Sequence, residues 1–207
     1  MSYYLFGLVL PLYLHSLPIL KIYIIFVLKL HLKRLVLKKI VVFFGKGGSN
    51  FLNILKHQTN YQVIFGITNR ADSEALKEPN IPPVLISKNH KEIYEKLKES
   101  NPDLIVLAGY MRIVPDFIIN EFNGKIINLH PSILPDFKGL NADKLSFEAK
   151  KACGITIHFA DIELDSGNII LQYHINPFKF NTFTEYHKEL KKAEHTFLPA
   201  VIEMLCG

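Results

Sequence analysis

The stretch that decides the fold class is Lys38–Asn50, KKIVVFFGKGGSN. Residues 40–44 form a short apolar run of β-branched and aromatic side chains, which predicts a strand. The glycines that follow predict a tight turn, and the apolar spacing of residues 51–55 predicts a helix. Strand, glycine turn and helix in this order are typical of the opening of a parallel α/β unit.

Similar segments continue this alternation along the chain. Further strands are predicted at residues 62–67, 84–86, 104–108, 126–129, 155–159 and 169–175. Further helices are predicted at residues 92–99, near 115–122 and at 184–205. The last two strands form a predicted pair joined by an acidic turn. The sequence therefore predicts a doubly wound α/β fold, with a mostly parallel sheet, helices on both faces and ligands at the carboxyl ends of the strands.

The composition excludes several classes of protein. Of the 207 residues 49% are apolar and 21% charged, so the chain can bury a core and is not intrinsically disordered. Cys153 and Cys206 are too few for a disulfide scaffold or a four-thiolate metal site, and we expect reduced thiols. Residues 1–39 hold six basic and no acidic residues, whereas the remainder holds 18 basic and 19 acidic residues. The body is therefore not basic, and we expect no nucleic-acid partner.

Residues 1–37 differ from the rest of the chain. They are mostly apolar, but Pro11, His15, Pro18 and Lys21 interrupt them before the roughly 20 apolar residues that a membrane helix needs. No basic segment precedes the apolar stretch, so it is not a clean secretory signal. Three interpretations stay open: a targeting or membrane-associating extension, a start codon assigned too far upstream, or an ordered part of the fold. We expect a domain at 38–207, a cytoplasmic location, and membrane contact only if the extension is genuine.

The glycine loop at residues 45–50 has the composition of an anion site. Glycines let the backbone approach a ligand, and the free amides at a helix N-terminus attract negative charge. Ser49 or Asn50 could add side-chain donors or could cap the helix. The loop matches neither the dinucleotide fingerprint nor the P-loop. A phosphate site and a plain strand-to-helix turn both stay open at this point.

Asn128 and His130 form a second candidate pair, at the end of a predicted strand. The two-residue period of a strand places both side chains on one face. A carboxamide that can bind an oxyanion beside an imidazole that can move a proton suits chemistry at a carbonyl group. The alternative is a strand-end histidine bonded to the backbone, with an asparagine in a turn.

Three more polar residues have two interpretations each. Asp165, in the acidic turn, is either ordinary turn chemistry or a carboxylate that orients His130. His158 is expected to be a buried or supporting histidine, because partners for a metal ligand are missing at suitable spacing. Arg112 either grips a planar or carboxylate ligand or opens the next segment in solvent. Glu194 is expected on a polar helix face beside Lys191.

Several motifs together resemble the formyltransferase family that uses 10-formyltetrahydrofolate. They are NLHPSILP at 128–135, FKG at 137–139, GITIH at 154–158 and DSG at 165–167. Within the family, GSN at 48–50, NRAD at 69–72 and LAGYMRI at 107–113 resemble the members that formylate glycinamide ribonucleotide in purine synthesis. Two features depart from the family. The glycine loop differs from its usual Ser-Gly-x-Gly-Ser-Asn, and the stretch from 72 to 101 is short.

The resemblance implies a Rossmann-like formyltransferase fold and a set of site residues. The catalytic residues are Asn128, His130 and Asp165. The ribonucleotide is bound by Gly48, Ser49, Asn50, Lys191 and Glu194. The folate is bound by Met111, Arg112, Ile113 and Val114, with the turn at 160–165, including Asp161, as the other wall.

The reaction implied by the resemblance is attack of the ribonucleotide's amine on the formyl carbon, through a tetrahedral intermediate. Asn128 is expected to bind the oxyanion, His130 to stabilise it and move a proton, and Asp165 to orient His130. The co-substrate is 10-formyltetrahydrofolate, no metal is needed, and the chain is a monomer or a homodimer. The alternatives are a methionyl-tRNA formyltransferase, a formyltetrahydrofolate hydrolase and a non-catalytic, membrane-tethered ligand-binding relative.

Overall fold

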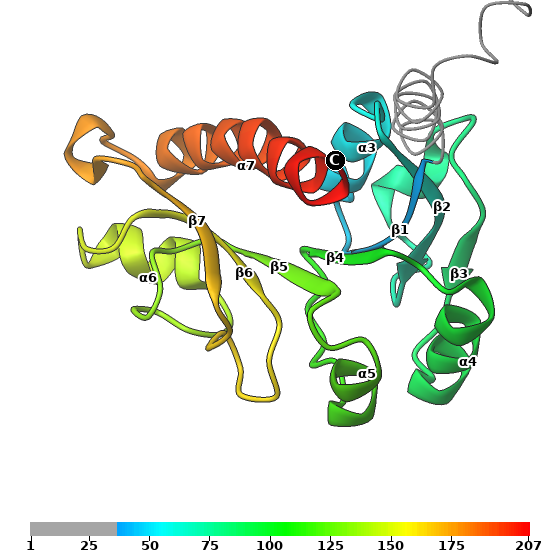
Figure 1. Cartoon of the computed structure of the whole chain (residues 1–207). Helices are drawn as coiled ribbons and strands as arrows, with labels where there is room; N and C mark the ends of the chain where they lie inside the picture. Colours follow the sequence, from blue (N-terminus) through cyan, green and yellow to red (C-terminus); the bar gives the residue numbers. More distant parts are fainter. Residues whose placement is uncertain (1–36) are drawn as a thin grey trace, which may run out of the picture. The chain divides into compact units, whose positions relative to one another are not determined.

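A single seven-stranded sheet organises the part of the chain that the structure, a computed structural model, describes: residues 37–207 (Figure 1). The N-terminal extension predicted at 1–37 thus lies outside the described residues, apart from Leu37. The strands are β1 (Lys38–Phe44), β2 (Tyr61–Thr68), β3 (Val84–Ile86), β4 (Leu104–Ala108), β5 (Ile126–His130), β6 (Gly154–Phe159) and β7 (Ile169–His174). The helices are α3 (Ser49–Lys56), α4 (His90–Ser100), α5 (Asp116–Glu121), α6 (Ala142–Glu148) and α7 (Phe183–Cys206), with short 3₁₀ turns at Glu74–Lys77 and Pro177–Lys179.

The strand order is β3-β2-β1-β4-β5-β6-β7. The strands from β3 to β5 are parallel, and β6 and β7 are antiparallel to their neighbours. The chain winds outward from β1 to β3 and then returns to β4 beside β1, so the order reverses between β1 and β4. Ligand sites of doubly wound sheets lie at such a reversal, outside the carboxyl ends of the strands. The predicted fold class and the predicted β6–β7 pair are confirmed.

Alternating side chains of β1 supply both layers of the core. Ile40, Val42 and Phe44 pack with α3, α6 and α7 on one face of the sheet. Val41 and Phe43 pack with α4 and α5 on the other. All five are at most 1% exposed, because a central parallel strand is covered on both faces. The prediction of helices on both faces is therefore confirmed.

One helix of the structure, α6, was not predicted from the sequence. Its buried residues are Ala142, Ser146 and Phe147, whereas Leu145 is exposed. A helix that buries a serine and exposes a leucine has no clear apolar stripe, which is the signal that sequence reasoning uses. Of the helices that the structure describes, none has the length and apolar character needed to span a membrane.

Candidate active site

Asn128 and His130 lie two residues apart on β5, and both contact Asp165, in the turn between β6 and β7. Asn128 Nδ2 donates a hydrogen bond to Asp165 Oδ1 at 3.1 Å. His130 Nδ1 lies 3.3 Å from Asp165 Oδ2, and the two side chains are 4% and 5% exposed. The shared strand face predicted for Asn128 and His130 is confirmed. The structure brings the three predicted catalytic side chains into one cluster, in which His130 and Asp165 are buried and Asn128 is half-buried.

Both ring nitrogens of His130 face oxygens that only accept hydrogen bonds. Nδ1 faces Asp165, and Nε2 lies 2.9 Å from the carbonyl oxygen of Phe137. A neutral imidazole has one N–H, so it can satisfy one of these oxygens at a time. Burial lowers the pKa of His130, and the Asp165 carboxylate and the Phe137 carbonyl oppose part of that shift. A ring held between two acceptors can take up and release a proton without turning away from the cluster.

Asp165 is held in its ionised form. The Gly139 amide donates to Oδ2 at 2.9 Å, and His158 Nε2 lies 3.6 Å from Oδ1. Burial by itself would raise the pKa of Asp165, but the contacts with His158, His130 and the Gly139 amide outweigh burial and lower the pKa to about 2. The backbone of Asp165 has φ = +50°, which is uncommon for a residue other than glycine. Such conformations concentrate at functional sites.

His158 adds a fourth side chain to the cluster, and it is buried. It is 1% exposed, which confirms the predicted burial, and it lies opposite Asn128 in the β5–β6 pair. Its Nε2 lies 3.2 Å from Asn128 Nδ2, and its Nδ1 lies 2.8 Å from the Phe159 carbonyl oxygen. A neutral imidazole has one N–H, so His158 either donates from Nδ1 to the Phe159 carbonyl and accepts from Asn128, or donates from Nε2 to Asp165. Asn128 Nδ2 thus donates to Asp165 and also lies within hydrogen-bond distance of His158.

The segment 132–139 closes over His130 and supplies contacts that sequence reasoning missed. Its Phe137 carbonyl and Gly139 amide reach His130 and Asp165. Thr156 Oγ1 donates to the Ser132 carbonyl at 2.7 Å, and Gln172 Nε2 donates to the Leu134 carbonyl at 2.8 Å, so β6 and β7 hold the segment in place. The segment was recognised through its motif. Its contacts are made by main-chain groups, which do not depend on the type of side chain, so the sequence alone could not predict them.

The glycine loop and α7 form a second polar cluster. Asn50 Nδ2 donates to Glu194 Oε2 at 2.7 Å, and Lys191 Nζ donates to the same oxygen at 2.6 Å. Asn50 and Glu194 are 4% and 3% exposed, so the expectation of a solvent-facing Glu194 is wrong. Burial of this carboxylate is tolerated because Asn50 and Lys191 compensate it. Gly48, with φ = +65°, is the N-cap of α3, and no side chain caps the helix among the described residues.

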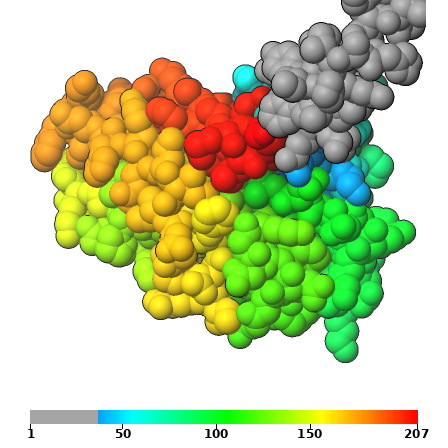
Figure 2. Space-filling view, in the orientation of Figure 1, coloured from blue at the N-terminus to red at the C-terminus, as the bar shows by residue number. Residues whose placement is uncertain are grey.

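The residues predicted to bind folate lie along the surface after β4 and β6. Met111 and Ile113 are 68% and 72% exposed, and Val114 packs on the core. Arg112 Nη1 donates a hydrogen bond to the Lys88 carbonyl at 3.0 Å. The Asp161 carboxylate accepts a hydrogen bond from the Ile162 amide, in its own turn, at 2.6 Å. The space-filling view shows the β6–β7 turn and the segment around α5 bordering each other (Figure 2).

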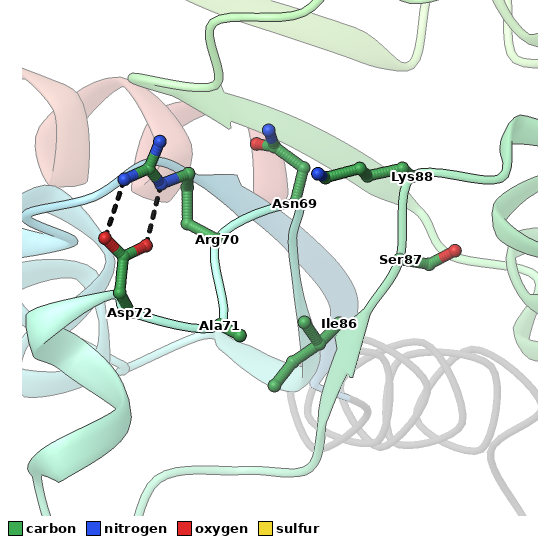
Figure 3. Close-up of a pocket in the computed structure, with 7 residues that line it drawn as sticks. All are labelled: Asn69, Arg70, Ala71, Asp72, Ile86, Ser87 and Lys88. Atoms are coloured by element: carbon green, nitrogen blue, oxygen red, sulfur yellow. Dashed lines mark hydrogen bonds and ion pairs between the residues drawn. The ribbon is translucent and has the colours of Figure 1, made fainter.

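A cavity of about 490 Å³ lies where β2 and β3 end, beside this surface (Figure 3). It is lined by Asn69, Arg70, Ala71, Asp72, Ile86, Ser87 and Lys88. Arg70 makes two hydrogen bonds to Asp72, at 2.8 and 2.6 Å. None of the residues predicted for the site lines this cavity, although the resemblance rests in part on the motif at 69–72. The cavity and the Asn128–Asp165 cluster are separate features.

Comparison with known proteins identifies the family. A family described as formyl transferase matches residues 38–202. The chain belongs to the formyl transferase family. It is 41% identical to the phosphoribosylglycinamide formyltransferase of Bacillus subtilis over 116 residues. This matched region covers 56% of this chain and 60% of that protein. It is 34% identical over 188 residues to the trifunctional purine biosynthetic protein adenosine-3 of Gallus gallus, covering 82% of this chain.

The chain spans less than two thirds of these two relatives: 60% of the first and 18% of the second. Solved structures agree over the whole fold. The phosphoribosylglycinamide formyltransferase of Campylobacter jejuni superposes with a TM-score of 0.72 at 34% identity, covering 82% of this chain and 98% of that one. The Rossmann-like formyltransferase fold implied by the resemblance is therefore confirmed, and the chain is similar to phosphoribosylglycinamide formyltransferases in both sequence and structure.

Proposed function

We propose that this protein is an enzyme that transfers the formyl group of 10-formyltetrahydrofolate to the amine of glycinamide ribonucleotide. The observation that carries the proposal is the contact of Asn128 and His130 with one ionised carboxylate, Asp165, at the carboxyl end of β5. Membership of the formyl transferase family and the likeness to phosphoribosylglycinamide formyltransferases support the same reaction.

In this proposal the amine attacks the formyl carbon, and the carbonyl oxygen becomes an oxyanion. Asn128 donates to that oxygen, which in known enzymes is worth roughly 3–4 kcal/mol of the barrier. Because its Nδ2 already donates to Asp165 and lies 3.2 Å from His158 Nε2, the amide turns at least partly away from these two groups on substrate binding. This exchange keeps the donor oriented until the oxyanion forms.

His130 and Asp165 handle the protons. The amine must lose a proton after attack, and the departing folate nitrogen must gain one. His130 stabilises the oxyanion and moves a proton, a contribution of about 100- to 10,000-fold. Asp165 holds the imidazole at 3.3 Å and helps to move the amine proton, directly or through water, to the departing folate nitrogen.

The second cluster is proposed to bind the ribonucleotide. The uncapped N-terminus of α3, with Gly48, Ser49 and Asn50, offers amides to the substrate's phosphate. Lys191 and Glu194 lie beside it on α7 and contact the rest of the ribonucleotide. The folate is proposed to lie along Met111–Val114 and the turn that holds Asp161. A cytoplasmic location fits the two buried, free cysteines.

The test is a set of incubations with 10-formyltetrahydrofolate and glycinamide ribonucleotide, together and singly. Formylated ribonucleotide that forms only when both are present supports the proposal. Release of formate without the amine would instead indicate a hydrolase, formylation of methionyl-tRNA would indicate the tRNA enzyme, and binding without turnover would indicate a non-catalytic relative.

A further inference from the structure

The glycine loop carries a lysine, Lys46, that the proposed function does not use. It lies two residues before Gly48, the N-cap of α3, in the loop that departs from the family's usual sequence. Its side chain is exposed, and among residues 37–207 its Nζ makes no hydrogen bond or ion pair. It is therefore a cation without an assigned partner at the edge of the ribonucleotide cluster.

The backbone on both sides of Lys46 is fixed in position. The Glu74 amide donates to the Lys46 carbonyl at 2.8 Å, and Ser73 Oγ donates to the Gly45 carbonyl at 2.9 Å. A Cβ added at Gly45 would lie 2.2 Å from the Gly109 carbonyl oxygen, so the loop also packs tightly on the end of β4. The loop is thus held on two sides, and the lysine extends from an anchored backbone rather than from a free tip.

Within the described part of the chain, no residue of α3 itself neutralises the positive end of the helix at its N-terminus. It has no side-chain cap and no acidic residue in its first turn. The first helical hydrogen bond runs from the Leu52 amide to the Gly48 carbonyl, so the amides of residues 49–51 precede it and point out of the helix. Free amides at this position attract an anion.

A second observation at the same turn points to a ligand. Asn50 is 4% exposed, and its Oδ1 has no hydrogen-bond partner among the described residues, although its Nδ2 is bound to Glu194. A buried carbonyl oxygen left without a donor is costly, so a bound molecule that supplies an N–H or O–H would relieve it. A ribose hydroxyl is such a donor.

The nearby acidic groups are already paired with other cations. Glu194 accepts from Lys191 and Asn50, and Asp72 accepts both hydrogen bonds of Arg70. Arg70 and, to a smaller extent, Lys46 lower the pKa of Asp72, but within residues 37–207 Lys46 forms no ion pair with that carboxylate, so its ammonium group remains available to a ligand. Lys46 differs in this respect from Lys191, whose ammonium group forms an ion pair with Glu194 at 2.6 Å.

We propose that Lys46 is a specificity-determining residue that binds the phosphate monoester of the amine substrate together with the α3 amides. This inference rests on the proposed function, since it deepens the binding of the same ribonucleotide. A phosphate dianion at a helix N-terminus takes up backbone N–H donors, and an ammonium group adds a charge-assisted hydrogen bond. Lys46 thus compensates for the departure of this loop from the family's pattern.

The test compares Lys46→Met with Lys125→Met in steady-state formyl transfer. Lys125 is a suitable control because it is exposed and lies directly before β5, at the amino ends of the parallel strands and away from the site. Lys46→Met is expected to raise KM for glycinamide ribonucleotide about tenfold, the size of one charge-assisted hydrogen bond, with kcat changed less than about twofold. Lys125→Met is expected to leave both unchanged. An unchanged KM in Lys46→Met would overturn the inference.

Two further measurements separate this inference from the proposed reaction. With the dephosphorylated amine, glycinamide riboside, wild type and Lys46→Met are expected to react equally, whereas a persistent defect would mean that Lys46 only supports the loop. Ribose 5-phosphate, titrated by calorimetry, is expected to bind about tenfold more weakly to Lys46→Met. If the wild type binds ribose 5-phosphate through Lys46 but never formylates the ribonucleotide, the proposed reaction fails and the inference stands. Equal binding by both proteins contradicts the inference.

Discussion

Asp165 connects the other members of the proposed catalytic cluster. Its carboxylate accepts from Asn128 and from the Gly139 amide and faces His130, and its own backbone has φ = +50°. From spacing alone its turn had two interpretations, because Asp165 and Asn128 are 37 positions apart in the chain. The family resemblance selected the catalytic role, and the contact with His130 is the geometry that this role requires.

The lowered pKa of Asp165 predicts a pH-dependent contribution to stability. A carboxyl group whose pKa falls from 3.8 to about 2 on folding stabilises the protein above pH 3.8 and loses that stabilisation as the pH falls toward 2. The contribution at neutral pH is on the order of 2 kcal/mol. We expect wild type to exceed Asp165→Asn in free energy of unfolding by about this amount at pH 7, and the difference to shrink below pH 4. Urea unfolding followed by circular dichroism from pH 7 to pH 3 measures it, and a constant difference would contradict the assignment.

At the scale of single elements, the sequence predicted buried strands more reliably than it predicted short helices. The strand at 104–108 has the predicted bounds, because a continuous apolar run is typical of a parallel strand that is covered on both faces. The edge strand at 84–86 also has the predicted bounds, although its Ile86 is 49% exposed. The helix α6 was missed because it buries Ser146 and exposes Leu145. Its position depends on tertiary contacts, such as the 3.2 Å contact of Cys153 Sγ with the Ser146 carbonyl.

The loop between β1 and α3 offers a matched pair of substitutions. A Cβ at Gly45 would lie 2.2 Å from the Gly109 carbonyl oxygen, whereas a Cβ at Gly47 would have nothing within 4 Å. Gly45→Ala must push β1 and β4 apart at the site, so we expect it to lower the free energy of unfolding by about 3 kcal/mol. Gly47→Ala is expected to change it by less than about 0.5 kcal/mol. Equal urea midpoints for the two variants would show that the ends of β1 and β4 do not approach each other as closely as the structure indicates.

For the molecule as a whole, the class of the fold and the order of its motifs could be predicted, but the surroundings of the site could not. Alternation on β5 placed Asn128 and His130 on one face. The polar helix face expected for Glu194 was wrong, because Asn50 from the distant loop of α3 buries and compensates it. The cavity beside Arg70 was missed, since a cavity depends on how loops after β2 and β3 pack rather than on any one motif.

The same view of the molecule predicts that residues 1–36 are not needed for folding or catalysis. All seven strands and every proposed site residue lie within 38–207, which form a compact unit by themselves, and the family match begins at residue 38. A chain without residues 1–36 is expected to keep the kcat of the full chain within about twofold and its free energy of unfolding within about 0.5 kcal/mol. Loss of turnover on truncation, with circular dichroism unchanged, would show that the extension takes part in the site.

The most direct test of the central claim follows a labelled formyl group from 10-formyltetrahydrofolate to glycinamide ribonucleotide in a single turnover. Wild type is expected to deliver the label to the amine, and His130→Ala is expected to do so about 100- to 10,000-fold more slowly, with its urea midpoint close to that of wild type. Transfer by His130→Ala at the wild-type rate, or label appearing as formate with no labelled ribonucleotide from the wild type, would contradict the account.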